Sequence, residues 1–288
     1  MYILEPKMPR MNPGGYILLP LVVAAACGAP RATSIRGDIA AVLDRGMAEG
    51  TDRFDHALWD AILRANAKSE GRRFDYSGLK EEEERLDAYL DVLASADLAR
   101  LTASELQALF INAYNAYTVK SILDHVREDG TFEIESIRDI PDVFVRKRHV
   151  VGGFELSLDD IEHTILRPIF RDPRLHFAVN CASISCPPLP VRAFDGEHLN
   201  EQLEAATKNV LTDADYVAVV DDALLVTKIL EWYGEDFVNP EFRGSEASIG
   251  SFIRKYADDS VREWIASRGD DDVTVRFRDY DWGLNRST

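Results

Sequence analysis

The chain has 288 residues, 46% hydrophobic and 29% charged, a composition that is ordinary for a soluble globular protein and excludes overall disorder. Its 33 basic and 50 acidic side chains give a formal net charge of −17, which disfavours binding to nucleic acid or to anionic lipid head groups.

Residues 1–26 are predicted to be an export signal. Basic residues precede the apolar run 16-YILLPLVVAAAC-27, which is too short to span a bilayer as a helix. The run ends in small residues and a cysteine, and this arrangement resembles the lipobox of bacterial lipoproteins, in which the cysteine is acylated. Gly28 is not an aspartate retention signal, so we expect a lipid on Cys27 to hold the protein at the periplasmic face of the outer membrane. Simple cleavage, giving a soluble periplasmic or secreted protein, is the alternative.

The first third of the chain is predicted to be helical. Residues 27–52 are expected to form a polar tether and a first helix. Apolar residues then recur at helical spacing over 54–62 and again over 79–93. Thr102 and Glu105 form a capping box, which predicts the start of a further helix.

The middle of the chain is predicted to mix short strands with helices. Two β-prone runs flank a Gly-Gly pair within 149–156 and predict a hairpin. Ser157 and Asp160 form a second capping box at the start of the next helix. Residues 175–179 are interpreted as a short buried strand that leads into a loop with two cysteines.

The last third is predicted to contain a helix over 197–211 and a hairpin over 216–227. Helices around Trp232 and Ile253 and a strand over 273–277 are expected to follow. No repeat or Pro/Gly-rich linker divides the chain. We therefore expect one α+β domain over residues 53–286, with a helical N-terminal layer and a small, mostly antiparallel sheet.

Two cysteines are the leading candidates for chemistry, Cys181 and Cys186 in the stretch 175-LHFAVNCASISCPPLP-190. In an oxidising compartment such a pair predicts a disulfide. A reactive thiol is the alternative: Cys181 would end a strand, and Pro187-Pro188 would start a helix with Cys186 as its N-cap. A zinc site is disfavoured because the spacing lacks the usual C-x2–4-C pair, and no cofactor-binding motif occurs.

Two histidines lie near these cysteines in the sequence. His163 is in line with Asp159 and Arg167, each four residues away on the predicted helix. A carboxylate one turn away orients an imidazole as a catalytic base requires, but the same spacing also fits a solvated charge ladder. His176 alternates with the inward positions of its predicted strand, and we expect it to be a buried or rim histidine with a structural role.

Five blocks of the sequence resemble motifs of the family called domain of unknown function 547. The resemblance extends from Arg53 to Asn285, and the family includes exported bacterial members without an established general activity. The blocks are ALFINAYNAYTVKSIL (108–123), LSLDDIEHTILR (156–167), HFAVNCASISCPPLP (176–190), LEWYGEDF (230–237) and DYDWGLN (279–285).

The resemblance implies that any shared chemistry rests on Cys181 and His163, since plant members often have serine at the position of Cys186. A thiol and an imidazole with an amide nearby are the layout of papain-like and transglutaminase-like enzymes, here in a rearranged order. Asn112 or Asn115 would then orient the base or donate to an oxyanion, although buried asparagines also hold neighbouring backbone. The residues at matching motif positions are Asn112, Tyr114, Asn115, Glu162, His163, Arg167, Cys181, Ser185 and Cys186.

The sequence leads to the hypothesis of a lipid-anchored thiol hydrolase or acyl transferase that acts on an amide, ester or thioester. Cys181 would be the nucleophile, His163 the base and Asp159 or an asparagine its orienting partner, with Cys186 as a modulator or redox partner. Glu162, Arg167 and Ser185 would support this site.

We expect no cofactor and no metal, a small-molecule or peptide substrate, and membrane contact through the lipid alone. One alternative is a non-enzymatic periplasmic binding or scaffold domain with a Cys181–Cys186 disulfide. Another is capture of a soft metal by the two thiols.

Overall fold

The computed structural model describes residues 33–287. The expected signal peptide and Cys27 lie outside the described residues. None of the described helices is long and apolar enough to cross a membrane.

The described chain has the α+β architecture that the sequence predicts, with helices predominating over short strands. The α-helices are α1 (Thr33–Glu49), α2 (Ala57–Asn66), α3 (Tyr76–Lys80), α4 (Glu83–Ala94), α5 (Ala103–Leu123), α6 (Leu199–Leu211), α7 (Ile229–Trp232), α8 (Gly234–Val238), α9 (Ile249–Tyr256) and α10 (Asp259–Ala266). The strands are β1 (Ala67–Lys68), β2 (Arg73–Phe74), β3 (His149–Val151), β4 (Phe154–Leu156), β5 (Val217–Val220), β6 (Ala223–Val226) and β7 (Val275–Phe277). Single-turn 3-10 helices are η1 (Ser69–Gly71), η2 (Leu98–Arg100), η3 (Ile137–Asp139) and η5 (Pro173–Phe177), and η4 (Asp160–Phe170) is a π-helix.

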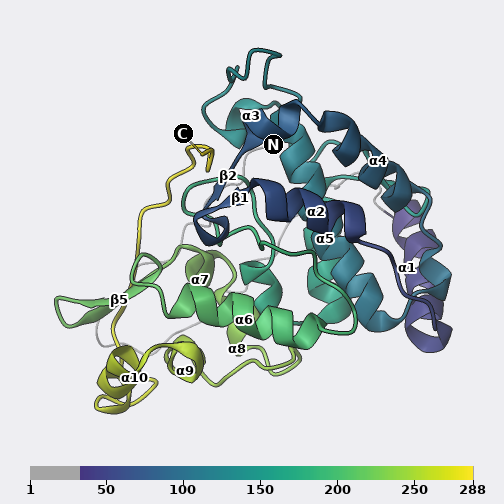
Figure 1. The fold of residues 1–288 in the computed structure, drawn as a ribbon. Helices are drawn as coiled ribbons and strands as arrows, with labels where there is room; N and C mark the ends of the chain where they lie inside the picture. Colours follow the sequence, from purple (N-terminus) through teal and green to yellow (C-terminus); the bar gives the residue numbers. More distant parts are fainter. Residues whose placement is uncertain (1–32, 288) are drawn as a thin grey trace, which may run out of the picture.

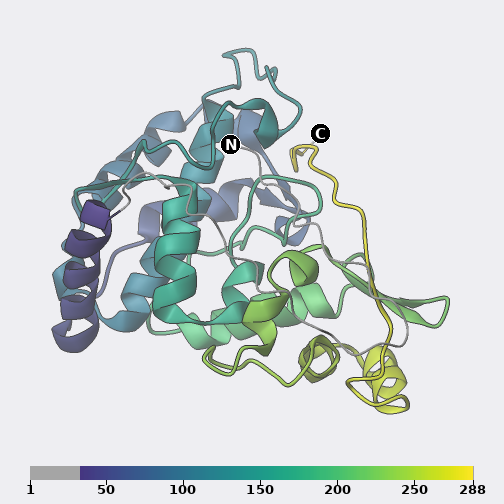
Figure 2. The same ribbon diagram turned by 180° about the vertical axis from the view of Figure 1, so that it is seen from behind.

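Helix α5 is the centre of the helical layer (Figures 1 and 2). Nearly all of its side chains from Glu105 to Leu123 are buried, as expected for a helix enclosed by other elements. Helices α1, α3 and α4 pack against it, and α2 packs against α4. The hydroxyl of Thr102 accepts a hydrogen bond from the backbone N–H of Glu105 at 3.3 Å, so the predicted helix start is confirmed.

The strands form three small sheets. β1 pairs with β2 and β3 with β4, both antiparallel, while β6 lies between antiparallel β5 and parallel β7. Both predicted hairpins are confirmed. Their turns contain Gly152 and Gly153 (φ 57° and 80°) and Asp221 and Asp222 (φ 46° and 59°), and positive φ at both central residues is the requirement of a tight two-residue hairpin.

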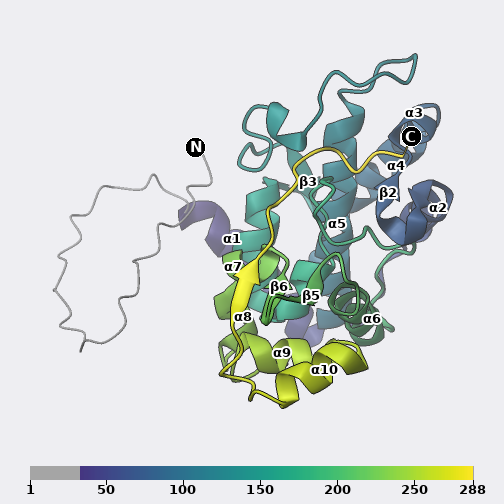
Figure 3. The ribbon, with the colours of Figure 1, turned by 90° about the vertical axis from the view of Figure 1, so that its left-hand side faces the viewer.

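Two hydrophobic cores lie side by side in the molecule. The first core consists of buried residues between Ile39 and Leu203, from the helical layer, β3, β4 and η4 among other elements, together with Leu284 near the C-terminus. The second core contains Phe177 and buried residues from Val210 to Ile265, with β5, β6 and α7–α10. Residues 278–287, here called the C-terminal segment, run from β7 back to the helical layer, as the yellow chain in Figure 3 shows.

The structure corrects two sequence predictions around the cysteines. Residues 175–179 do not form a strand, because Pro173 and the Asp172 side chain, which accepts from the N–H of Arg174 at 3.1 Å, start the 3-10 helix η5 instead. No helix follows Cys186 either, and residues 187–190 have no regular structure. The reason is that Pro187 precedes another proline, and a residue in that position is disfavoured in the α conformation.

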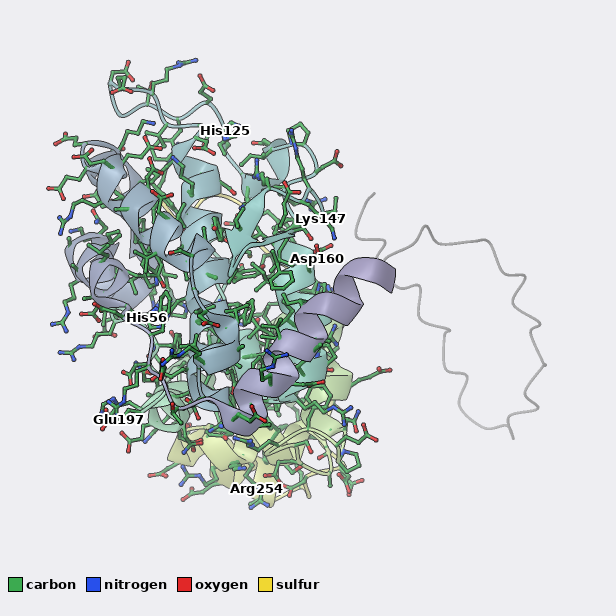
Figure 4. All side chains as sticks on the ribbon, turned by 90° about the vertical axis from the view of Figure 1, so that its right-hand side faces the viewer. His56, His125, Lys147, Asp160, Glu197 and Arg254 are labelled. Carbon is green, nitrogen blue, oxygen red and sulfur yellow. The ribbon has the colours of Figure 1, made fainter. Side chains whose placement is uncertain are left out.

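Helix η4 begins at the predicted capping box and carries part of the candidate site. The Asp160 carboxylate accepts from the N–H of Ser157, and the Ser157 hydroxyl accepts from the N–H of Asp160, both at 3.0 Å. Nζ of Lys147 lies 3.5 Å from the same carboxylate and forms an ion pair with it at the start of the helix (Figure 4). A π-helix of this length is rare, and π-turns often occur at functional sites.

Candidate functional site

A cavity of about 310 Å³, here called the thiol cavity, lies where the two cores meet. Its walls come from α5, η4, η5, the loop 178–190 that carries the cysteines, α7 and the C-terminal segment. Six of the site residues expected from the sequence line it: Asp159, Glu162, His163, Arg167, Cys181 and Cys186. Tyr114, which occupies one of the motif positions, lines it too.

The Cys181 thiol is surrounded by hydrogen-bonding groups. Its Sγ lies 3.1 Å from Sγ of Cys186, 3.1 Å from Oγ of Ser183 and 3.3 Å from the hydroxyl oxygen of Tyr280. Hydrogen bonds from Cys186, and then from Ser183 and Tyr280, outweigh the opposing effect of burial and lower the pKa of Cys181 to about 7. A large fraction of this thiol is therefore the reactive thiolate at neutral pH.

The two cysteines are free and chemically unequal. Cys186 is buried, and the backbone N–H of Cys181 donates to its Sγ at 3.0 Å. Burial, together with the neighbouring Cys181, raises the pKa of Cys186 well above its usual range. Cys186 therefore stays protonated and stabilises the Cys181 thiolate as a donor.

The structure brings His163 to the same cavity as Cys181 without placing the two in contact. The ring is partly exposed, with Nδ1 3.4 Å from Nη1 of Arg167 and Nε2 4.0 Å from Oδ1 of Asp159. Its Nδ1 is also 3.9 Å from Oε1 of the buried Glu162. No hydrogen bond joins His163 to Cys181 within residues 33–287, so the groups that lower the pKa of Cys181 are the Cys186 thiol, two hydroxyls and the backbone N–H of Ser183.

A buried network connects Arg167 to His176 through Asp236. Arg167 donates to the two carboxylate oxygens of Asp236 at 2.7 and 2.9 Å, and Nε2 of His176 lies 2.8 Å from Oδ2. Burial alone would raise the pKa of Asp236, but the hydrogen bonds from His176 and Arg167 hold it at about 2. Burial also lowers the pKa of His176, which is therefore neutral and donates from Nε2, while its buried Nδ1 has no partner among the described atoms.

Aromatic rings complete the thiol cavity. Tyr233 stacks on His176 with ring centroids 4.0 Å apart, and Tyr280 packs against Trp232 at 4.8 Å and Trp282 at 4.6 Å. Burial raises the pKa of Tyr280 well above its usual range, so its hydroxyl stays a neutral donor. The sequence blocks 230–237 and 279–285 contain these rings and Asp236, yet sequence reasoning attached no role to them.

Two predicted site residues, Asn112 and Asn115, lie outside the thiol cavity and hold backbone. Asn112 exchanges hydrogen bonds of 2.8 and 3.0 Å with the backbone of Phe194. Asn115 donates to the carbonyl of Ala178 at 2.9 Å and accepts from the N–H of Asn180 at 2.8 Å. Both side chains are fully buried, and the second one fixes the start of the cysteine loop.

Ser185 also lies outside the thiol cavity. Its hydroxyl accepts from the N–H of Asp281 at 2.9 Å, and its own N–H donates to the Asp281 carbonyl at 3.2 Å. Ser185 thus ties the cysteine loop to the C-terminal segment. Over the described part of the chain, no group of three or more histidine, cysteine, aspartate and glutamate side chains is arranged to hold a metal ion.

Residues 98–211 match the model of the family described as "Protein of unknown function, DUF547". This region contains α5, η4 and both cysteines, and the match supports the resemblance to that family over these residues. The blocks at 230–237 and 279–285, which supply Asp236 and the aromatic rings of the cavity, lie beyond it. No curated protein and no solved structure shows significant similarity to the chain.

Proposed function

We propose that this protein is a thiol-dependent hydrolase or acyl transferase whose nucleophile is Cys181. The observation that carries the proposal is the environment of the Cys181 sulfur, where three hydrogen bonds lower the thiol pKa to about 7 at the wall of a cavity. Burial alone has the opposite effect and raises the pKa of a thiol, as it does at Cys186.

The proposed reaction proceeds through an acyl-enzyme. The Cys181 thiolate attacks the carbonyl carbon of an ester, thioester or amide, and the leaving group departs with a proton donated by His163 as general acid. Water or an acceptor nucleophile then gives a proton to His163 and attacks the thioester, which releases the acyl group and restores the thiolate. His163 acts on the substrate's leaving group because Cys186, Ser183 and Tyr280 already stabilise the thiolate.

The roles of the neighbouring residues follow from their contacts. Asp159 and Glu162 lie beside the imidazole of His163, with carboxylate-to-ring-nitrogen distances of 4.0 and 3.9 Å, and can orient the ring. Arg167 is held by Asp236 through two hydrogen bonds and keeps η4 fixed against α8. Catalytic hydrogen bonds are often long without substrate, so we expect His163 to engage only when a substrate fills the cavity.

The direct test is acylation by 4-nitrophenyl esters and by acyl thioesters, with the adduct located by mass spectrometry. We expect rapid acylation of Cys181 in the wild-type protein and none in Cys181→Ala. His163→Ala should still be acylated but should turn over about 10²- to 10⁴-fold more slowly, the usual contribution of a general acid–base group.

His125→Ala is the matched control, because His125 is a partly buried histidine that lies outside the thiol cavity. It should acylate and turn over like the wild type. If Cys181 is acylated no faster than a free peptide cysteine, the proposal that it is the nucleophile is wrong. If His163→Ala and His125→Ala turn over equally fast, the proposed acid–base role of His163 is wrong.

We also propose that the enzyme is lipid-anchored in the periplasm through Cys27, at the outer membrane. The support is the N-terminal sequence, in which an apolar run ends in Ala24-Ala25-Ala26-Cys27. Cys27→Ala should move the protein from the membrane fraction to the soluble fraction, and a variant that stayed equally membrane-bound would contradict the anchor.

A second candidate function is a binding or scaffold domain in which the two thiols act as a pair. The 3.1 Å separation of the Cys181 and Cys186 sulfur atoms favours it, since both could join in a disulfide or hold one soft metal ion. Titration of free thiols in protein isolated from the periplasm distinguishes the candidates. Two titratable thiols support the enzyme, and none until a reductant is added supports the bridge.

A further inference from the structure

A second cavity adjoins the thiol cavity and has a different chemical character. It measures about 400 Å³, and Tyr280 lines both cavities. Four basic side chains face two carboxylates in its lining, although the whole chain carries a formal charge of −17. We call it the basic cavity; its charged lining residues are Arg72, Arg73, Lys228, Arg278, Asp215 and Asp279.

Two of the four cations already have carboxylate partners. Arg72 pairs with Asp213 and with Asp215, the latter at 3.1 Å, and Lys228 pairs with Glu231 at 2.5 Å. These pairs neutralise part of the cavity wall and hold its side chains in place.

The other two cations share the lining of the cavity with Asp279, a carboxylate that is itself in no salt bridge of the described chain. No salt bridge joins Arg73 or Arg278 to another residue of the described chain. Arg278 donates from Nη2 to the carbonyl of Ala214 at 2.7 Å, while its Nε is buried without a hydrogen-bond partner. The guanidinium charge of Arg278 therefore has no carboxylate partner at the cavity wall, so the site is suited to an oxyanion that supplies one.

The backbone turn that precedes Arg72 and Arg73 is strained. Ser69, Glu70 and Gly71 all have positive φ, at 49°, 57° and 88°, which is unfavourable for the first two. The turn is held against the cysteine loop, where the N–H of Leu189 donates to the carbonyl of Gly71 at 2.9 Å. A side chain at position 71 would clash with that loop, because its Cβ would lie 1.8 Å from the Leu189 carbonyl oxygen.

We propose that the basic cavity binds the anionic end of the substrate, a carboxylate or a phosphate, through Arg73 and Arg278. The anion would lie near the thiol, because Tyr280 lines both cavities and its hydroxyl is 3.3 Å from the Cys181 sulfur. Anion binding rests on the cavity alone. The role of that anion as part of the substrate rests on the proposed thiol chemistry, and it makes the substrate an acyl compound with a negatively charged end.

Anion binding is tested by titrating the purified full-length protein with succinate and, separately, with inorganic phosphate at constant ionic strength. Tryptophan fluorescence is a suitable readout, since Tyr280 packs against Trp232 and Trp282. We expect a saturable change with one or both anions, and the anion that binds more tightly identifies the class. Arg73→Gln and Arg278→Gln should each weaken binding at least about tenfold, the loss expected for one charge-assisted hydrogen bond.

Arg276→Gln is the control, because this exposed arginine on β7 lines neither cavity and its loss removes the same charge. The far-ultraviolet circular dichroism of each variant checks the fold, and Arg73, which makes no salt bridge, is the variant least able to disturb it. No saturable change with either anion, or equal affinity in all three arginine variants, would overturn the proposed site.

A second measurement connects the anion to the thiol. Cys181 should be acylated faster by the 4-nitrophenyl half-ester of succinate than by neutral 4-nitrophenyl butyrate, and Arg73→Gln should remove this preference. Cys181→Ser should bind the free anions like the wild type. Normal anion binding with no acylation overturns the thiol chemistry alone, whereas acylation of Cys181 without charge preference and without anion binding overturns the anion site alone.

Discussion

Replacing Tyr280 with phenylalanine tests the account of the reactive thiol most directly. The change removes one of the three hydrogen-bond donors around the Cys181 sulfur, a hydroxyl 3.3 Å away, and leaves the ring that packs on Trp232 and Trp282. The hydroxyl of Ser183, whose oxygen lies 2.9 Å from the Tyr280 oxygen, also loses that partner. We expect the pKa of Cys181 to rise.

The size of the rise in the Cys181 pKa follows from the balance between hydrogen bonding and burial at the sulfur. Three hydrogen bonds together overcome burial and bring the pKa of Cys181 to about 7, against about 8.5 for a free thiol. The hydrogen bond from Tyr280 lowers the pKa less than those from Cys186 and Ser183 do, and its loss should raise the pKa by about 0.5 to 1 unit. At pH 6, where the thiolate is the minor form, this corresponds to about 3- to 10-fold slower alkylation.

The assay is the rate of iodoacetamide labelling from pH 5 to 10, with mass spectrometry to assign the label to Cys181. Tyr216→Phe is the matched control, because the Tyr216 hydroxyl donates to the backbone carbonyl of Cys186 at 2.8 Å and does not contact the Cys181 sulfur. An unchanged pKa in Tyr280→Phe, or an equal shift in Tyr216→Phe, would refute the reasoning.

Three further predictions address stability, positioning and oxidation. Burial lowers the pKa of His149 to about 3, so below about pH 6.5 the unfolded chain binds a proton that the folded protein excludes. The free energy of unfolding in urea should therefore fall by about 1.4 kcal/mol per pH unit from this residue as the pH drops from 6.5 to 3. His149→Gln should remove this contribution to the slope. Asn115→Ala and Asn112→Ala should each lower the free energy of unfolding by about 2 to 4 kcal/mol. Only Asn115→Ala should also slow the alkylation of Cys181, since only the Asn115 side chain holds the cysteine loop. Equal alkylation rates in the two variants would contradict this role. Mild oxidation should join Cys181 to Cys186 by a disulfide within one chain, because their sulfur atoms are 3.1 Å apart. The chain should lose two mass units and resist alkylation, and a thiol reductant should reverse both changes. Intermolecular dimers alone would contradict the proximity of the two thiols.

The elements that the sequence predicted well are those with local signals. The capping residues Thr102 and Ser157 mark the starts of their helices, and the turn residues of both hairpins are adjacent in the sequence. The strand predicted over 175–179 is wrong because a strand and a buried turn have the same composition at that length. Local chemistry, here a preceding proline and an aspartate cap, decided between them.

The candidate site could be predicted only in part for a different reason. Cys181, His163 and Arg167 were identified as site residues and do line one cavity. The group that contacts the thiol from the C-terminal segment, Tyr280, is 99 residues away from Cys181, and no periodicity or spacing rule connects such positions. The distinction between the two thiols likewise depends on burial and on tertiary donors, which a sequence without a structure does not contain.

The late position of Tyr280 has a consequence for biosynthesis. Cys181 leaves the ribosome 99 residues before the hydroxyl that contacts its sulfur, and the C-terminal segment must then cross from the second core to the first. Until that segment docks, the cysteine lacks one of its donors and the aromatic rings beside it, so it resembles an ordinary thiol. Nascent and truncated chains are therefore expected to be poor targets for electrophiles. Reactivity at Cys181 would report that a chain has been synthesised through Tyr280 and has folded.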